Sequence, residues 1–321
     1  EEICVFTLSH QGYIKRMPVD TYRTQSRGGR GINAQNLKDE DYVKSLTIAS
    51  THEHMLFFTD RGRVHHRKGY QIPEAGRTAR GTAIINVLPL EPGESVTAMV
   101  ITREFDDNEF LMMVTRKGTV KRIPFIALKT NRRGGIRAIT LDEDDHLINV
   151  IRTCGADNIL LATAHGMAIC FSEQDVRPMG RDAAGVRGIS LSEGDFVVGA
   201  EKAEEGKTLL TVTVNGYGKR TELSEYLRTG PDGEKTPQSR GGKGLKNYNI
   251  TEKTGKVAGC RVVDDTDDIM LIENGGVIIR VPASDINVYK RDVQGVIVMR
   301  IEEGNQLVAI ERIEKDEEAS E

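Results

Sequence analysis

The sequence has no tryptophan among its 321 residues, and aromatic residues make up only 5% of it. Propeller repeats of the WD type have a tryptophan in their repeat motif, so its absence argues against that class. No apolar run approaches the ~20 residues that a membrane-spanning helix needs, and no basic start with an apolar stretch indicates a secretory leader. The chain begins at Glu1 instead of a methionine, which we interpret as the start of a fragment of a longer protein.

Cysteine is also scarce, and the four cysteines form no CxxC pair: Cys4, Cys154, Cys170 and Cys260. Such spacing predicts reduced core thiols of a cytosolic protein. Four histidines lie in two short clusters, His52 with His54 and His65 with His66. Because neither cluster has cysteines or carboxylates at ligand spacing, we interpret both as surface histidines and expect no metal and no cofactor.

What the chain does have is a repeat. A short apolar run and a glycine recur six times, in three repeats with a basic pair after them, and the glycines are Gly12, Gly62, Gly118, Gly166, Gly216 and Gly276. A second marker, a glycine in five repeats, follows 19 to 28 residues later: Gly31, Gly81, Ala138, Gly188, Gly244 and Gly295. Two markers kept in phase predict an array of similar units, each packed on its neighbours.

The repeated runs are rich in Val, Ile, Leu, Thr and Phe, which is typical of strands. The first glycine supplies the positive φ of a hairpin turn, and about 50 residues hold about four strands, as in a propeller blade. We therefore predict an all-β fold in a single repeat domain, with a linear β-solenoid as the structural alternative. The predicted blades are about 1–50, 51–103, 104–154, 155–204, 205–265 and 266–313 of the domain 1–313.

Two segments depart from the repeat. Residues 227–244 insert glycine, proline and charge between the markers of the fifth unit, which predicts a long loop. The C-terminal residues 314–321 are mostly Glu and Asp with few apolar side chains, which predicts a disordered acidic tail.

The charge is distributed unevenly although the net charge is only −4. Equivalent positions of a repeat array share one zone of the surface. A concentration of cations there is the electrostatic footprint of a polyanion. The segments between the markers have net charges of +5 (10–38), +5 (61–81), +8 (116–137), 0 (164–188), +3 (215–246) and +1 (276–295).

The cations of these segments are the predicted contacts. We expect units one to three to bind most tightly and unit four least, because Ile169 and Cys170 replace its basic pair. The predicted contacts are Lys15, Arg16, Arg67, Lys68, Arg77, Arg80, Lys121, Arg122, Lys129, Arg132, Arg133, Arg137, Lys219, Arg220, Arg240 and Lys243.

A glycine–arginine box adds to them, formed by Gln25, Ser26, Arg27, Gly28, Gly29, Arg30 and Gly31. Glycines let backbone amides approach phosphates closely, and the two arginines provide paired donors that suit phosphate geometry. No pattern here is suited to base edges, so binding should not depend on sequence. A second copy of the box spans residues 238–244.

The chain resembles, along essentially its full length, the family of C-terminal domains of the DNA gyrase A protein. The family hallmark is such a box in the first blade after a strand like Gly12–Arg16, and Ser26 here replaces the usual arginine. The resemblance implies a six-bladed β-pinwheel whose blades exchange strands and whose rim bends double-stranded DNA. It further implies a non-catalytic part of an ATP-dependent type II topoisomerase of the bacterial cytoplasm, at the nucleoid. The implied partners are the rest of the gyrase A protein and the gyrase B protein.

Three other classes remain open. The equivalent domain of topoisomerase IV usually lacks the box and often has fewer blades. A protein-interaction propeller would explain the repeats but not the basic segments in phase with them. An enzyme would need convergent catalytic groups, and no motif in the sequence indicates them.

The box makes a first testable prediction. The double substitution Arg27→Ala with Arg30→Ala should abolish DNA wrapping more than it weakens binding to straight duplex, because it removes phosphate donors needed to hold a bend. Ligation of nicked plasmid in the presence of the protein measures the wrapping. Unchanged plasmid topology with the double variant would contradict a role for the box.

Overall fold

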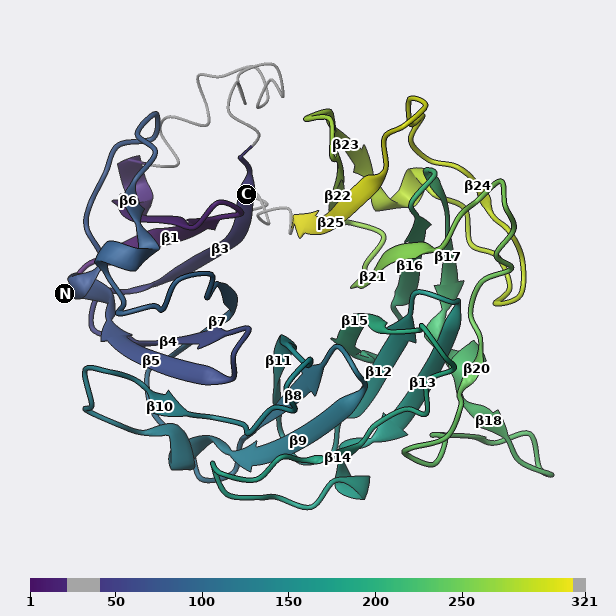
Figure 1. The fold of residues 1–321 in the computed structure, drawn as a ribbon, viewed down its shortest axis with the longest axis horizontal. Coiled ribbons are helices and arrows are strands. Elements are labelled where there is room, and N and C mark those ends of the chain that lie inside the picture. Colours follow the sequence, from purple (N-terminus) through teal and green to yellow (C-terminus); the bar gives the residue numbers. More distant parts are fainter. Residues whose placement is uncertain (22–40, 314–321) are drawn as a thin grey trace, which may run out of the picture. The chain divides into compact units, whose positions relative to one another are not determined.

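The computed structural model describes residues 1–21 and 41–313, and their regular elements are mostly short antiparallel strands joined by turns and loops (Figure 1). They form two compact units. The first contains residues 1–110, 123–152 and 179–184, and the second contains 111–122, 153–178 and the residues from 185 onward.

Each repeat opens with a hairpin, as predicted. In the first, β1 (Ile3–Ser9) and β2 (Tyr13–Pro18) meet at Gly12, and all six predicted turn glycines have φ between 79° and 91°. The other hairpins are β4 (His54–Thr59) with β5 (Arg63–Lys68), β8 (Phe110–Thr115) with β9 (Thr119–Pro124), β12 (Asn158–Thr163) with β13 (Met167–Ser172), β16 (Thr208–Thr213) with β17 (Tyr217–Glu222), and β22 (Asp268–Glu273) with β23 (Ile278–Pro282).

A third strand pairs with the first strand of each hairpin on its other side. These strands are β3 (Val43–Ser50), β7 (Val96–Thr102), β11 (Leu147–Thr153), β15 (Val197–Lys202), β21 (Val257–Val263) and β25 (Leu307–Ile313). The first strands are buried on both faces. That burial explains why they are nearly continuous apolar runs without polar alternation.

The fourth strand comes from the following repeat. β6 (Thr82–Ala83) follows β5 in the chain but pairs with β2 of the preceding hairpin. In the same way β10 (Ile136–Arg137), β14 (Val186–Arg187), β20 (Leu245–Lys246) and β24 (Val296–Ile297) pair with β5, β9, β13 and β17. The sheet orders are β3-β1-β2-β6, β10-β5-β4-β7, β11-β8-β9-β14, β15-β12-β13-β20 and β21-β16-β17-β24, and in the described part the sixth is β23-β22-β25.

These sheets confirm the all-β fold, the six blades and the exchange of strands between them. The remaining elements are short. A small hairpin of β18 (Arg228–Thr229) and β19 (Lys235–Thr236) lies in the insertion of the fifth repeat. The 3₁₀ helices are η2 (Gly69–Gln71), η3 (Ile84–Asn86), η4 (Phe125–Leu128), η5 (Glu173–Asp175), η6 (Leu223–Tyr226) and η7 (Ala283–Asp285).

The cores lie between neighbouring sheets inside each unit. In the first unit Phe6 and Ile14 pack with Met55 and Phe57 of the next sheet. In the second unit one cluster contains Leu160, Leu209 and Tyr226, and another contains Leu210, Leu271 and Ile310. A single blade therefore cannot bury its apolar faces alone, as expected for a repeat array.

Three of the four cysteines belong to these cores. Cys4, Cys170 and Cys260 are buried, and burial raises the pKa of Cys170 and of Cys260 to about 12. They are therefore protonated thiols at neutral pH, in keeping with the predicted core role. Cys154 is exposed, so the prediction is wrong for that residue.

Two turn glycines test the backbone geometry. A Cβ on Gly216 (φ +86°) would overlap the Met299 carbonyl oxygen, whereas a Cβ on Gly206 (φ +83°) meets nothing within 4 Å. Gly206→Ala should cost about 1–2 kcal/mol of unfolding free energy from its left-handed φ alone. Gly216→Ala should cost clearly more because backbone must also move, and urea unfolding measures both. Equal losses would contradict the assigned overlap.

Candidate nucleic-acid interface

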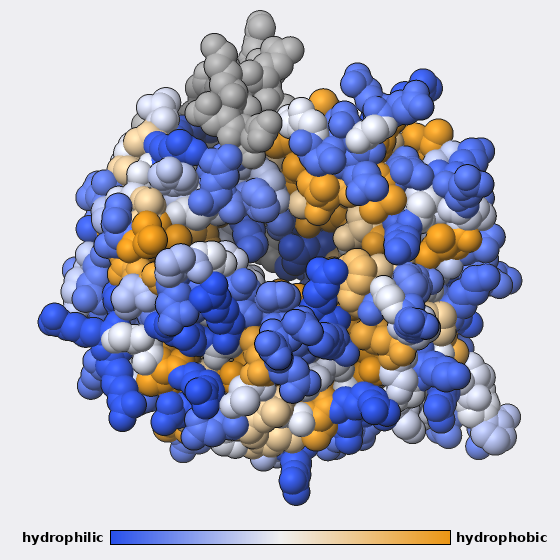
Figure 2. All heavy atoms as spheres, in the orientation of Figure 1, coloured by the Kyte–Doolittle hydropathy of each residue, from blue (hydrophilic) through white to orange (hydrophobic). Residues whose placement is uncertain are grey.

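The glycine–arginine box at Gln25–Gly31 and the tail at 314–321 lie outside the described residues. The other predicted cations lie on the second strands of the hairpins and on the loops that lead into the exchanged strands. On the face of the molecule in Figure 2 hydrophilic side chains predominate, with smaller apolar patches between them.

The arginines of the three basic pairs point inward. Each Nε donates to the carbonyl that follows a 3₁₀ helix of the next repeat: Arg16 to Ile72 (2.7 Å), Arg122 to Val176 (2.6 Å) and Arg220 to Ile286 (2.7 Å). Arg122 and Arg220 are only 7% and 5% exposed. Carboxylates neutralise them, such as Glu173 at 3.3 Å from Arg122. These arginines join adjacent repeats, which corrects their interpretation as surface contacts.

The lysines of the same pairs are interior as well. Lys121 and Lys219 have no exposed surface (0%). The Lys219 ammonium donates to the carbonyls of Lys290 (2.7 Å) and Arg291, and burial lowers the pKa of Lys219 to about 8. Half-buried Lys15 donates to three loop carbonyls, those of Gly76 (3.0 Å), Arg77 (2.9 Å) and Ala79 (2.8 Å). Direct phosphate contact by the two fully buried ammonium groups is not compatible with this geometry.

Histidines take the place of the pair in the second repeat. His65 is 0% exposed, so its interpretation as a surface residue is wrong. Nε2 of His66 lies 2.7 Å from Nδ1 of His54. Burial lowers the pKa of His65 and of His66 to about 4, so both are uncharged near neutral pH. The next residue, Arg67, is half-buried and donates to the carbonyl of Val87 at 3.2 and 3.1 Å.

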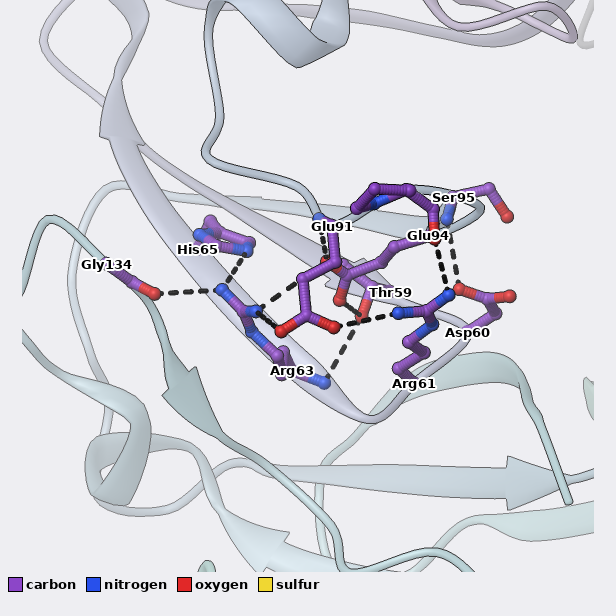
Figure 3. A network of polar contacts seen from close by, with 10 residues as sticks. Thr59, Asp60, Arg61, Arg63, His65, Glu91, Glu94, Ser95 and Gly134 are labelled. Carbon is purple, nitrogen blue, oxygen red and sulfur yellow. Dashed lines mark hydrogen bonds and ion pairs between the residues drawn. The ribbon is translucent and has the colours of Figure 1, made fainter. Parts of the chain in front are cut away.

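Other cations of the second repeat are neutralised locally (Figure 3). Arg61 lies 2.8 Å from a carboxylate oxygen of Glu91, and Arg63 lies 3.5 Å from the other oxygen. Arg63 is also 3.7 Å from Glu94, whose buried carboxylate accepts the Thr59 hydroxyl at 2.7 Å. The charge of +5 counted for residues 61–81 therefore overstates what this segment offers a polyanion, because both acids lie outside it.

The second copy of the box is held by hydrogen bonds to the preceding repeat and to its own repeat. The Gln238 amide donates to the carbonyl of Cys170 at 2.8 Å, and the Gln238 side chain, 5% exposed, donates to that of Tyr226 at 2.8 Å. Arg240 donates to the carbonyls of Asp175 (3.0 Å) and Arg187 (2.7 Å). Of its two cations, only Lys243 is exposed.

Most of the predicted cations that face solvent lie on the loops. Arg80, Lys129, Arg132, Arg133 and Arg137 are exposed in the first unit, and Lys243 is exposed in the second. Arg77 and Lys68 are half-buried, and Lys68 donates to the carbonyl of His52 at 3.1 Å. The predicted residues thus divide into interior cations on the strands and exposed cations mainly on the loops.

Exposed cations also occupy one repeated position that was largely missed at the level of sequence. The second residue of three successive exchanged strands is an exposed cation: Arg137 in β10, Arg187 in β14 and Lys246 in β20. Only Arg137 was predicted. The signal was present in the sequence as a glycine, an aliphatic residue and a cation, at 135–137, 185–187 and 244–246. Lys290 is a further exposed cation of the sixth loop.

Two other kinds of feature are absent from residues 1–21 and 41–313. No three His, Cys, Asp or Glu side chains of these residues are grouped so that they could hold a metal ion. In the same part of the chain no helix is long and apolar enough to cross a membrane.

Buried His65 and half-buried His66 predict a pH dependence of stability. They stay neutral in the folded chain down to about pH 4, but bind protons below about pH 6.5 when unfolded. The unfolding free energy should therefore fall between pH 6.5 and 4, by at most about 1.4 kcal/mol per pH unit for each histidine. Urea unfolding across this range should show a flatter profile for His65→Gln with His66→Gln. Parallel profiles would show that these histidines are not the cause.

Known proteins resemble this chain over nearly all of its length. The model of the family described as "DNA gyrase C-terminal domain, beta-propeller" matches residues 5–50, 53–103, 109–154, 157–204, 207–235, 237–264 and 267–314. The chain is 47% identical over 317 residues to the DNA gyrase A protein of Clostridium acetobutylicum, covering 99% of this chain and 37% of that protein. It is 44% identical over 321 residues to the Staphylococcus epidermidis gyrase A protein, covering 99% and 35%.

Two solved structures share the fold. The C-terminal domain of a DNA topoisomerase IV superimposes with a TM-score of 0.83 at 25% identity, over 98% of this chain and 94% of that one. A DNA gyrase A C-terminal domain superimposes with a TM-score of 0.73 at 23% identity, over 97% and 99%. The chain spans about a third of the length of the gyrase A proteins that it matches.

Proposed function

Because the chain belongs to the family of DNA gyrase A C-terminal domains, we propose that it binds double-stranded DNA without sequence preference and bends it. The contacts proposed are the exposed cations of the loops and exchanged strands, together with the box at Gln25–Gly31. The interior cations of the basic pairs are excluded from this set.

The observation that supports this proposal most directly is the repeated cation of the exchanged strands. Arg137, Arg187 and Lys246 occupy one register position in three successive sheets. Positions equivalent in the repeat face the same zone of a repeat array. Within the second unit, a duplex that follows this zone would meet Arg187 and Lys246 at the repeat spacing, and the loop cation Lys243 is exposed in the same unit. In the first unit Arg137 has the equivalent position, and Arg133 is an exposed cation of its loop.

Counterion release drives such binding. Bending 20–30 base pairs by 40–90° costs on the order of 1–6 kcal/mol, and phosphate contacts must exceed this cost. About 6–10 contacts lose a factor of ~10³–10⁵ in affinity between 50 and 200 mM salt. Lysine and arginine side chains recognise phosphates and not base edges in this arrangement, which makes the binding independent of sequence.

The activity of the whole enzyme is a wider proposal, since the chain is about a third of its relatives. The domain itself is non-catalytic. By holding a bent duplex, it would present one DNA segment to the breakage-reunion part of the gyrase A protein, while the ATP-driven gyrase B protein powers the introduction of negative supercoils. The location proposed is the bacterial cytoplasm, at the nucleoid.

A second candidate is the corresponding domain of topoisomerase IV. The TM-score of 0.83 to such a domain favours it. The match of 47% identity to a gyrase A protein and the glycine–arginine box favour gyrase.

The decisive test combines affinity and topology. Affinity of the chain for linear duplex should fall steeply with salt, and ligation of nicked plasmid with the chain should trap writhe of one hand. The triple variant Arg137→Ala, Arg187→Ala, Lys246→Ala should make the negative slope of log affinity against log salt shallower by about 2.7, at about 0.9 for each lost phosphate contact.

The matched control removes the same charge elsewhere. Arg103, Lys253 and Lys256 are exposed cations outside the loops that lead into the exchanged strands, and changing all three to alanine should leave the slope unchanged. A flat salt dependence of the unmodified chain, or equal effects of the two triple variants, would refute the proposed track.

A further inference from the structure

Two lysines hold the loop of the next repeat at the same two carbonyls. Lys15 binds the carbonyls of Gly76 and Arg77, which are the fifth and fourth residues before the loop glycine Gly81. Lys219 binds the carbonyls of Lys290 and Arg291, the fifth and fourth residues before Gly295. We call this arrangement the lysine clamp. Because the same contact recurs at equivalent positions in two repeats, it is a feature of the repeat and not of one loop.

The first clamped loop presents an exposed cation to solvent. Arg80 directly follows Ala79, whose carbonyl Lys15 also binds at 2.8 Å. The Arg80 guanidinium lies 4.0 Å from the ring centroid of Tyr13 and donates to Oε1 of Gln11. Tyr13 and Lys15 are two residues apart on β2, so their side chains leave the same face of the strand. That face therefore fixes both the backbone of the loop and the direction of its arginine.

The second clamped loop shares the lysine-to-carbonyl contact, but its exposed cation lies at another position of the loop. Lys219 is fully buried, and the carbonyl that it binds at 2.7 Å belongs to Lys290, whose own side chain is exposed. The ring of Tyr248 lies 5.2 Å from the Lys219 ammonium. An ammonium group offers three donors and no acceptor, which suits carbonyls that converge on one point.

We propose that Lys15 and Lys219 are positioning residues of the DNA surface. Each ammonium keeps its loop in the conformation that projects the exposed cation, Arg80 in one case and Lys290 in the other, without touching DNA itself. This inference rests on the proposed function for the identity of the ligand.

One repeat lacks the clamp lysine, and Ile169 of β13 occupies its position. Arg240, the fourth residue before Gly244 in the loop of the next repeat, donates to the carbonyls of Asp175 and Arg187. Arg291, at the same position of the loop that Lys219 clamps, donates to the carbonyl of Lys246 at 2.9 Å. This arginine contact therefore occurs with and without the clamp lysine, and the exposed cation of the loop without it is Lys243.

Amine modification tests the proposal on the unaltered chain. Reductive methylation followed by peptide mass spectrometry should leave Lys15 and Lys219 unmodified with or without linear duplex. Lys243 and Lys290 should be modified in free protein and protected by DNA. Modification of Lys15 or Lys219 in free protein with protection by DNA would overturn the proposal. If the chain binds no duplex at all, the proposed function fails, while unreactive Lys15 and Lys219 would still establish the clamp.

A double-mutant cycle separates positioning from direct contact. Lys15→Met and Arg80→Ala should each make the negative slope of log affinity against log salt shallower by about 0.9. The slope of the double variant should be no shallower than that of either single variant. Lys253→Met, which removes an exposed charge outside the loops that lead into the exchanged strands, should leave the slope unchanged. Additive losses, or an unchanged slope in either single variant, would overturn the proposal. If Lys15→Met does not fold, the methylation pattern alone decides.

Discussion

The structure depends on hydrogen bonds that the cations of one repeat donate to backbone carbonyls of the next. Burying an ammonium or guanidinium is costly unless its donors are satisfied. Arg220 and Lys219 meet this condition with main-chain oxygens near η7 and in the following loop. A carbonyl is present at every residue, so the same contact between repeats can recur even where the side chains of the accepting residues differ. The exchanged strands add main-chain pairing to these joints.

Much of the architecture could be predicted from the sequence because it depends on local patterns. The turn glycines, the strand composition and the spacing of the markers indicated the hairpins and the six blades. The strand exchange followed only from the family resemblance. Pairing between β2 and β6 joins Tyr13 to Ala83 and Ile14 to Thr82, far apart in the sequence, and no short-range pattern specifies such a partner.

The candidate site was harder to predict for a related reason. A basic pair on a strand has the same composition whether it faces solvent or a neighbouring repeat. Lys121 and Lys219 were therefore predicted as surface residues although they are completely buried. The ion pairs that neutralise Arg61 and Arg63 could not be predicted from the sequence either, since Glu91 and Glu94 lie about 30 residues after these arginines. The cations of β14 and β20 could have been found, because their glycine–aliphatic–cation pattern repeats.

Sharing a strand between neighbours also affects how such an array can change in length. Each internal sheet takes its fourth strand from the repeat that follows and lends one to the repeat before. Excision of the chain between equivalent points of two repeats would join the first part of one repeat to the second part of another. Every exchanged strand would then still have a hairpin in the preceding repeat with which to pair. Gain or loss of whole repeats in the gene thus needs no new kind of contact between repeats, so arrays with different numbers of blades can be built from one repeat type.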